Sequence, residues 1–462
     1  MKYASPARPS TITFEVERTE ATTARYHPAM LRRVFPNIYE GWIVVGAFAL
    51  LVVMIGTSFF YGFGTIFKPV IADFGWSNAQ VSLAFSLRSE VGGIAAPIIG
   101  IMIDRFGPRR SLFAGVIVSS LGVFGLSYMQ NLWQFYFGMF VIALGVSASG
   151  GPVGQVATAM WFDRRRARAL SYLTVGGAIA GLGVPVVAWL VETAGWRDAL
   201  RYLGFAILVV GMFSTLNVRG RPADHHQPMD GDPDLAPGET RRRRIFWGAP
   251  IGQVLRSRAF FMVAAAQATV GFGTTALIVH IIPYLESNGV SKTAAASAVT
   301  AYTLFSLVGR LGLGYLADKY DKRLVLTFAC LLVALGMPLL AFTHDLLPTM
   351  LVLLLIAPGF GGTIPVRPAI LADYFGTKYF GSVNGAMVFV QTLGAFFGPW
   401  LVGGIVDATG QYTLGWLACG AVTALAVPLM FFAFPPHALI ARYSNAEDDT
   451  LEATATPLPE AH

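Results

Sequence analysis

The sequence predicts an all-α membrane protein with twelve transmembrane helices, arranged as two pseudo-symmetric bundles of six. Hydrophobic residues make up 55% of the 462 residues and charged residues only 13%, a composition that does not suit the surface of a water-soluble protein. Apolar stretches long enough to cross a bilayer recur along the chain. A polar motif in the first half of the chain also recurs in the second half.

Each predicted span is an apolar run of about 20 residues, the length that a helix needs to cross a bilayer. Short breaks with charged residues, glycine or proline separate the runs. The first 40 residues are polar, with no apolar run near Met1, so we expect no cleaved signal peptide. The predicted spans cover residues 42–67, 78–103, 110–128, 132–160, 168–191, 199–218, 259–285, 293–317, 324–343, 346–372, 379–406 and 413–434.

An internal repeat divides the chain into two halves. Four positions recur at an offset of 214 residues: Gly100 with Gly314, Asp104 with Asp318, Arg105 with Lys319, and Arg109 with Arg323. Paired halves around a central site are typical of secondary transporters. We therefore expect an N-terminal tail (1–40), a six-helix bundle (41–218), a linker (219–258), a second six-helix bundle (259–435) and a C-terminal tail (436–462).

The distribution of Lys and Arg predicts the orientation, because cytoplasmic loops retain these residues. Nineteen fall in loops that follow even-numbered spans, including Arg164, Arg165, Arg166 and Arg168. Only four fall in the opposite loops: Lys68, Arg197, Arg201 and Lys292. We expect a multi-pass protein of a cell membrane, the bacterial inner membrane, with both termini in the cytoplasm.

The sequence argues against several other classes of protein. The net charge of +7 comes from cations at span ends rather than from one basic face, so we expect no nucleic-acid partner. No lysine follows a glycine, which excludes a Walker A loop. We find no catalytic motif and expect no enzyme activity, cofactor or metal. Cys330 and Cys419 lie in apolar spans, where we expect them to pack rather than form a disulfide.

The loop from Gly100 to Arg110 carries the most specific motif. Asp104 ends its own span, where its charge opposes the helix dipole, so it requires a nearby cation or the N-terminus of another helix. The loop fits the pattern Gly-x-x-x-Asp-Arg-x-Gly-x-Arg-Arg at every fixed position, and the chain therefore resembles the major facilitator superfamily. This resemblance implies a cytoplasmic gate, with candidate gating residues Gly100, Asp104, Arg105, Arg109, Asp318 and Arg323.

Further motifs resemble the branch that holds the monocarboxylate transporters and the oxalate/formate antiporters. They are Glu40-Gly41-Trp42, the run from Trp161 to Ala169, and the run from Asp373 to Gly376. The chain also departs from the animal carriers of that branch. Ser306 stands where they have an Asp before the eighth-span arginine, and Tyr61 aligns with their first-span lysine. Both groups serve proton coupling in that family, so its coupling mechanism does not transfer directly.

Few ionisable residues lie inside the predicted spans, where they are costly and usually face a cavity. They are Arg88, Glu90, Arg310 and Arg367, with His280 near an outer rim. Arg310 lies about 12 Å along its helix from Asp318, close to the middle of the membrane. A guanidinium group suits a carboxylate because its planar fork donates two parallel hydrogen bonds. Each arginine could instead clamp two helices together.

These residues predict a secondary active transporter of a small organic mono- or dicarboxylate, working by alternating access, with proton coupling or anion exchange. The candidate substrate-binding residues are Arg310, Arg367, Tyr61, Tyr302, Gln155 and Asn384, and the candidates for proton coupling are Glu90, His280 and Arg88. The alternatives are an exporter of drugs or other metabolites and a transporter-like sensor. We expect a monomer in the lipid bilayer, with the carboxylate and either protons or a counter-anion as its partners.

Overall fold

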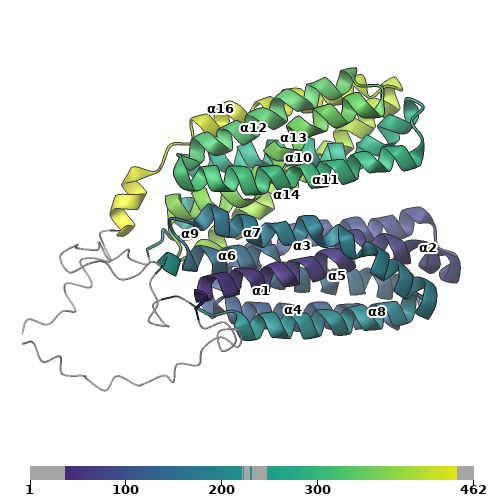
Figure 1. The fold of residues 1–462 in the computed structure, drawn as a ribbon, viewed down its shortest axis with the longest axis horizontal. Coiled ribbons are helices and arrows are strands. Elements are labelled where there is room, and N and C mark those ends of the chain that lie inside the picture. The colour runs from purple at the N-terminus through teal and green to yellow at the C-terminus, as the bar shows by residue number, and fades with distance from the viewer. Residues whose placement is uncertain (1–36, 221, 223–228, 232–246, 445–462) are drawn as a thin grey trace, which may run out of the picture.

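The computed structural model describes residues 37–220, 222, 229–231 and 247–444. In this part of the chain the helices form two bundles, α1 to α8 and α10 to α16 (Figure 1). The short α9 (Ile251–Val254), which belongs to the predicted linker, lies at one end of both bundles. We call this the linker end and the opposite end the far end.

The N-terminal bundle contains six spans, three of them built from more than one helical segment. Gly195, with a φ of 79°, divides α8 into the end of the fifth span and the whole sixth span. The elements are α1 (Glu40–Ile55), the π-helical turn η2 (Gly56–Tyr61), α2 (Phe63–Phe74), α3 (Asn78–Phe106), α4 (Pro108–Ser127), α5 (Leu132–Ser149), α6 (Gly151–Trp161), α7 (Arg166–Ile179), the 3-10 turn η3 (Ala180–Gly183) and α8 (Val184–Asn217).

The C-terminal bundle also contains six spans. Prolines inside four of its long helices are tolerated because neighbouring groups in a membrane bundle can satisfy the freed carbonyls. Its elements are α10 (Arg258–Ser287), α11 (Lys292–Lys319), α12 (Lys322–Leu339) with the 3-10 turn η6 (Leu340–Phe342), α13 (Leu346–Phe375), α14 (Phe380–Thr409), α15 (Thr413–Ala424) and α16 (Ala426–Phe431).

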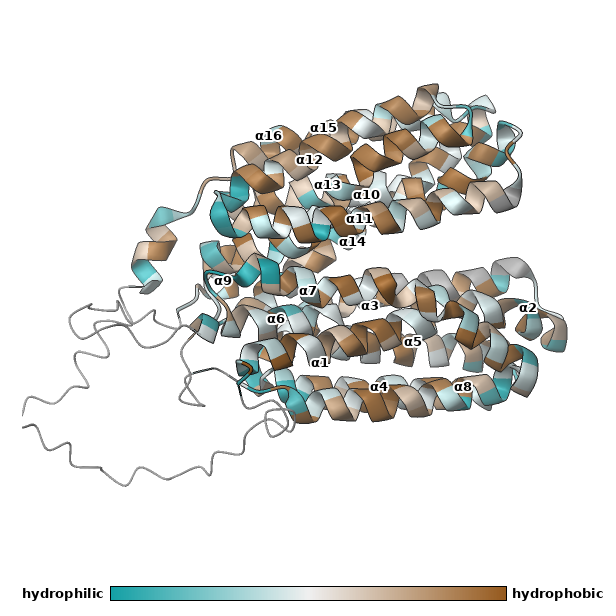
Figure 2. Cartoon of the chain, in the orientation of Figure 1, coloured by the Kyte–Doolittle hydropathy of each residue, from teal (hydrophilic) through white to brown (hydrophobic). Residues whose placement is uncertain are grey.

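The predicted number of spans is confirmed. Ten helical segments in the described residues are long and apolar enough to cross a membrane. The segment 166–217 counts twice because Gly195 divides it. The twelfth span is α3, which is less apolar because it carries charged residues, among them Glu90 and Asp104. Figure 2 shows hydrophobic residues along the bundles and hydrophilic ones gathered toward their ends, as a bilayer requires.

Two interrupted spans lie side by side within the N-terminal bundle. The hydroxyl of Thr57 in η2 donates to the carbonyl oxygen of Ala180 in η3 at 2.7 Å. Single π-helical turns often occur at functional sites, and broken helices in transporters line the substrate site. The last residue of η2 is Tyr61, whose side chain is 39% exposed.

The two bundles meet through close glycine contacts. A Cβ at Gly100 of α3 would lie 2.2 Å from the carbonyl oxygen of Gly381 of α14. A Cβ at Gly314 of α11 would lie 1.8 Å from the hydroxyl oxygen of Ser171 of α7. Only glycine allows such an approach at either position. The repeated glycines of the motif therefore let α3 pack on α14 and α7 pack on α11.

Candidate functional site

Asp104 and Asp318 hold the two bundles together at the linker end. The Asp104 carboxylate accepts hydrogen bonds from the backbone N–H groups of Gly381 and Ser382, both at 2.7 Å, and from the Ser382 hydroxyl at 2.5 Å. These donors form the first turn of α14. The predicted need of Asp104 for another helix's N-terminus is thus met across the interface.

Asp318 makes the equivalent contact from the other bundle. Its carboxylate accepts from the backbone N–H groups of Ala167 and Arg168, at 2.9 and 3.1 Å, and from Nε of Arg168 at 3.0 Å. Its side chain is only 1% exposed. Each of these carboxylates places a negative charge at the positive end of a helix dipole, so the two contacts stabilise a closed linker end.

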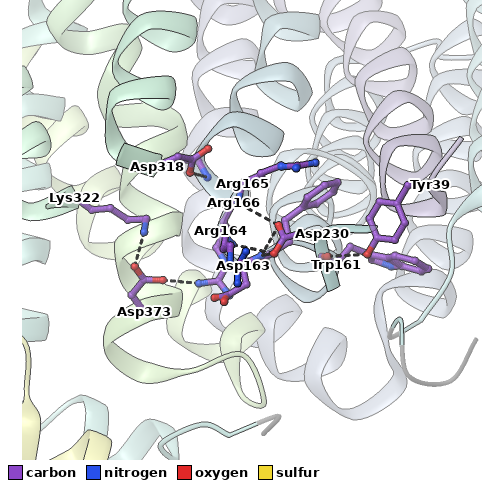
Figure 3. A network of polar contacts seen from close by, with 12 residues as sticks. Tyr39, Trp161, Asp163, Arg164, Arg165, Arg166, Asp230, Asp318, Lys322 and Asp373 are labelled. Carbon is purple, nitrogen blue, oxygen red and sulfur yellow. Dashed lines mark hydrogen bonds and ion pairs between the residues drawn. The ribbon is translucent and has the colours of Figure 1, made fainter. Parts of the chain in front are cut away.

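A second ionic contact crosses the interface beside Asp318 (Figure 3). Arg166, whose side chain is 5% exposed, donates to Asp373 at 2.5 Å and lies 3.3 Å from Asp163. Lys322 pairs with the other oxygen of Asp373 at 2.7 Å. Arg166 and Asp373 both belong to the branch motifs of the sequence, which did not reveal that they pair.

Asp230 joins the linker to the same group of contacts, and sequence reasoning missed this. Its carboxylate accepts from the backbone N–H groups of residues 163, 164 and 165, at 3.0 to 3.3 Å, and it is 4% exposed (Figure 3). Asp230 has a φ of 62°, which is uncommon for a residue other than glycine. The adjoining Gly231 packs against the ring of Tyr39. Asp230 and Asp318 together bind consecutive stretches of the turn that begins α7.

The structure does not bring the three predicted gating arginines into these contacts. Arg105 and Arg109 are exposed, and the Arg105 guanidinium carbon lies 5.5 Å from the ring centroid of its neighbour Phe106. Arg323 stays within the C-terminal bundle, donating to the carbonyl oxygen of Phe431 at 3.0 Å. A gating role for these arginines stays a prediction.

Arg310 lies deeper, where α11 faces α7. It is 9% exposed, and its Nη1 donates to the carbonyl oxygen of Thr174 in the opposite bundle. Its Nε has no hydrogen-bond partner, and it forms no ion pair within the described residues. The phenol groups of Tyr61 and Tyr302 are close enough to interact electrostatically with it. Arg310 therefore carries a buried charge that no carboxylate of the described chain neutralises.

Tyr302 supplies a second unsatisfied polar group near Arg310. Its side chain is 4% exposed, its hydroxyl has no hydrogen-bond partner, and its ring stacks on Phe360 with centroids 5.5 Å apart. An apolar pocket between α10, α11 and α13 reaches its ring and includes Ile281 and Leu353. Arg310 does not line this pocket. A cation and a hydroxyl near apolar side chains are nevertheless the kinds of group that bind a small organic anion.

Gln155 and Asn384 bind each other rather than facing an open site. The Asn384 amide nitrogen donates to the Gln155 side-chain oxygen at 2.9 Å, across the interface between α6 and α14. Both side chains are buried, and Asn384 lies within one turn of the Asp104 contact. In this conformation the pair extends the closure of the linker end, and its role in substrate binding stays a prediction.

The candidates for proton coupling lie apart from one another. Glu90 is half-buried on α3 and makes no ion pair within the described residues. The side chain of Arg88 lies outside the described residues. His280 contacts the carbonyl oxygen of Pro399 through Nε2 at 3.0 Å, and its ring lies 5.9 Å from that of Tyr412. His280 is therefore held within the C-terminal bundle.

Comparison with known sequences identifies the fold. The pattern of the Major Facilitator Superfamily matches residues 47–279 and 263–458. The chain belongs to the major facilitator superfamily. It is 27% identical to monocarboxylate transporter 13 of Bos taurus over 442 residues, which cover 91% of this chain and 96% of the relative. It is 24% identical to monocarboxylate transporter 2 of Homo sapiens over 409 residues, covering 84% of each chain.

These relatives confirm the resemblance to the monocarboxylate branch of the superfamily, and they are transporters rather than enzymes. A bacterial relative, the uncharacterised superfamily transporter YcxA of Bacillus subtilis, is 26% identical and covers 77% of this chain and 86% of that protein. Among solved structures, the transporter FucP in its outward conformation matches with a TM-score of 0.68 at 14% identity, covering 86% of this chain and 99% of FucP. That likeness supports the fold alone.

Proposed function

We propose that this chain carries a small organic carboxylate across a cell membrane, with Arg310 as the group that binds the carboxylate. Arg310 is buried, reaches from one bundle to the other, and has a free donor and no neutralising carboxylate within the described residues. A desolvated guanidinium without an anion is costly in a membrane. A substrate carboxylate would remove that cost while joining both halves.

The proposed cycle begins from the conformation described above. The Asp104 and Asp318 contacts close the linker end, and the Lys and Arg distribution supports the proposal that this end faces the cytoplasm. In this state the substrate would reach Arg310 from the far end and compete with the Thr174 carbonyl for the guanidinium. The two bundles would then rock about the site, breaking the linker-end contacts. The bacterial inner membrane and the monomeric state stay predictions.

Coupling to protons or to a counter-anion is the second part of the proposal. Glu90 is the acidic candidate, because it is half-buried on a helix of the interface without an ion pair in the described chain. Arg367 lies in the same membrane interior and adds a second positive charge. A mono- or dicarboxylate is therefore compatible with the charges of the site.

The test is uptake by proteoliposomes containing the purified protein. Labelled formate, acetate, lactate, pyruvate, oxalate, malonate and succinate would be compared with fucose and with a lipophilic drug cation, with and without an inward proton gradient. We expect saturable uptake of at least one carboxylate and none of the sugar or the cation. Stimulation of uptake by the inward proton gradient indicates proton symport. Stimulation of uptake by an unlabelled carboxylate loaded inside the liposomes indicates exchange. Uptake of the sugar or the cation without any carboxylate would contradict the proposal.

A further inference from the structure

Arg367 is a second buried cation in the C-terminal bundle, and no charged group of the described residues pairs with it. Its side chain is 7% exposed on α13, and its Nη1 donates to the side-chain oxygen of Gln391 on α14. Its Nε has no hydrogen-bond partner, and it forms no ion pair in the part of the chain that the structure describes. A neutral amide satisfies only one of its donors and leaves its charge uncompensated.

A second buried amide lies on the adjoining helix with its own hydrogen bonds unmade. Gln267 of α10 is 1% exposed, and neither its nitrogen nor its oxygen has a partner. It lies one helical turn before Gly271 and thus on the same face of α10. A Cβ at Gly271 would lie 3.4 Å from Cγ of Gln391, so this face of α10 is directed toward Gln391.

The packing of α11 on α13 places Arg367 nearer the linker end than Arg310. A Cβ at Gly309, next to Arg310, would lie 1.8 Å from the carbonyl oxygen of Pro358. The two helices run in the same direction, and a Cβ at Gly361 would lie 2.0 Å from the carbonyl oxygen of Ser306. Counted along the helices from these two contacts, Arg367 lies roughly 3 to 12 Å closer to the linker end than Arg310. Pro365 and Pro368 bracket Arg367 and each remove a backbone donor.

We propose that Arg367, with Gln391 and Gln267, forms a second carboxylate station that holds the substrate on the linker side of Arg310. This inference rests on the proposed function, since the ligand is the same small carboxylate. A buried cation lined by amides with spare donors provides the chemistry that an anion needs. The station would receive the carboxylate after the linker end opens and Arg310 releases it.

The test measures the half-saturating concentration of labelled lactate and malonate separately at each face, in proteoliposomes of known orientation. Arg367→Gln should raise this concentration at least tenfold at the linker face and change it less than twofold at the far face. The half-saturating concentration of Arg367→Lys at the linker face should lie between those of Arg367→Gln and the wild type, because the point charge of lysine binds a carboxylate less well than the planar guanidinium group. The matched control is Arg201→Gln, at a partly exposed arginine paired with Asp198, and it should match the wild type.

A second variant distinguishes an anion station from a structural clamp. Gln391→Glu would supply a carboxylate directly beside Arg367. If the arginine only clamps α13 to α14, this change strengthens the clamp and leaves both half-saturating concentrations unaltered. If Arg367 binds substrate, the new carboxylate pairs with Arg367 and raises the half-saturating concentration at the linker face at least tenfold. Gln391→Glu therefore still tests the proposal if Arg367→Gln fails to fold.

The outcomes separate the two proposals. If the wild type moves none of the seven acids of the uptake test, both the proposed function and the second station are wrong. Suppose that the wild type transports an acid and that Arg310→Gln abolishes this transport. If Arg367→Gln and Gln391→Glu then change the half-saturating concentration equally at both faces, or at neither, only the second station is wrong. A selective loss at the linker face supports it.

Discussion

Asp104 and Asp318 occupy equivalent positions in the two halves, and each carboxylate binds the first turn of a helix in the opposite half. The internal repeat therefore appears in the structure as a matched pair of contacts between the bundles. Because both contacts lie at the linker end, they must break together when that end opens.

Neutralising Asp104 tests this gate. Asp104→Asn keeps the shape of the side chain, but its single amide oxygen can accept at only one of the two positions at which the carboxylate oxygens accept. The lost hydrogen bonds to a charged group are worth about 1.5 to 3 kcal/mol each. We expect a looser linker end and slower carboxylate uptake at an unchanged amount of inserted protein. Asp318→Asn should behave alike. The exposed Asp407 supplies the control, since Asp407→Asn should keep the wild-type rate. An unchanged rate in Asp104→Asn would count against the gate.

The pair of Arg166 and Asp373 is suited to a double-mutant cycle. Their atoms lie 2.5 Å apart, and Arg166 is buried while Asp373 is partly exposed. Close pairs with a buried partner couple by about 1.5 kcal/mol or more. Thermal unfolding of Arg166→Gln, Asp373→Asn and the double variant should reveal this coupling. Additive effects of the two substitutions would show that the pair contributes nothing to the closed state.

The linker contact of Asp230 predicts a local change in amide exchange. Asp230→Ala removes the acceptor of three N–H groups, and hydrogen bonds to a charged group are worth about 1.5 to 3 kcal/mol. Hydrogen–deuterium exchange of residues 163–165 should accelerate about tenfold or more, while residues in α12 should not change. Exchange at the wild-type rate would show that Asp230 does not protect this turn.

Sequence reasoning could predict the fold and the need of Asp104 for a partner because their causes are local. Apolar length defines the spans, and a carboxylate at the end of its own helix requires a partner such as another helix's N-terminus. The position of Asp104 therefore predicted that it makes such a contact, although it did not identify the partner. The glycines at positions 100 and 314 were visible as a repeat, although the helices that they contact were not.

Other parts of the site depend on contacts between distant residues. Gln155 and Asn384 are 229 positions apart, and nothing in either segment shows that they satisfy each other. Asp230 lies in a polar segment without periodicity, so its role could only emerge from the folded chain. The exposure of Arg105 and Arg109 shows the reverse case, in which a motif residue makes no contact between the bundles in this conformation.

Glu90 provides a test of coupling. Glu90→Gln retains the size of the side chain but cannot release a proton. If Glu90 carries the coupled proton, this variant should lose accumulation driven by a proton gradient and keep exchange of substrate for substrate. Both activities can be measured in the same proteoliposome preparation. Unchanged accumulation would direct attention to His280, because an imidazole can also carry a proton.

The central claim is that Arg310 binds the carboxylate of the substrate. The direct measurement is equilibrium binding of the transported acid, and of its neutral amide analogue, to the purified wild type, Arg310→Ala and Arg310→Lys, with Arg201→Ala as control. Truncating one partner of a buried charge pair costs about 2 to 5 kcal/mol, so Arg310→Ala should weaken acid binding roughly 30-fold to several thousand-fold. Arg310→Lys should retain part of the affinity for the acid that Arg310→Ala loses. Equal binding of acid and amide by the wild type, or normal acid affinity in Arg310→Ala, would contradict the claim.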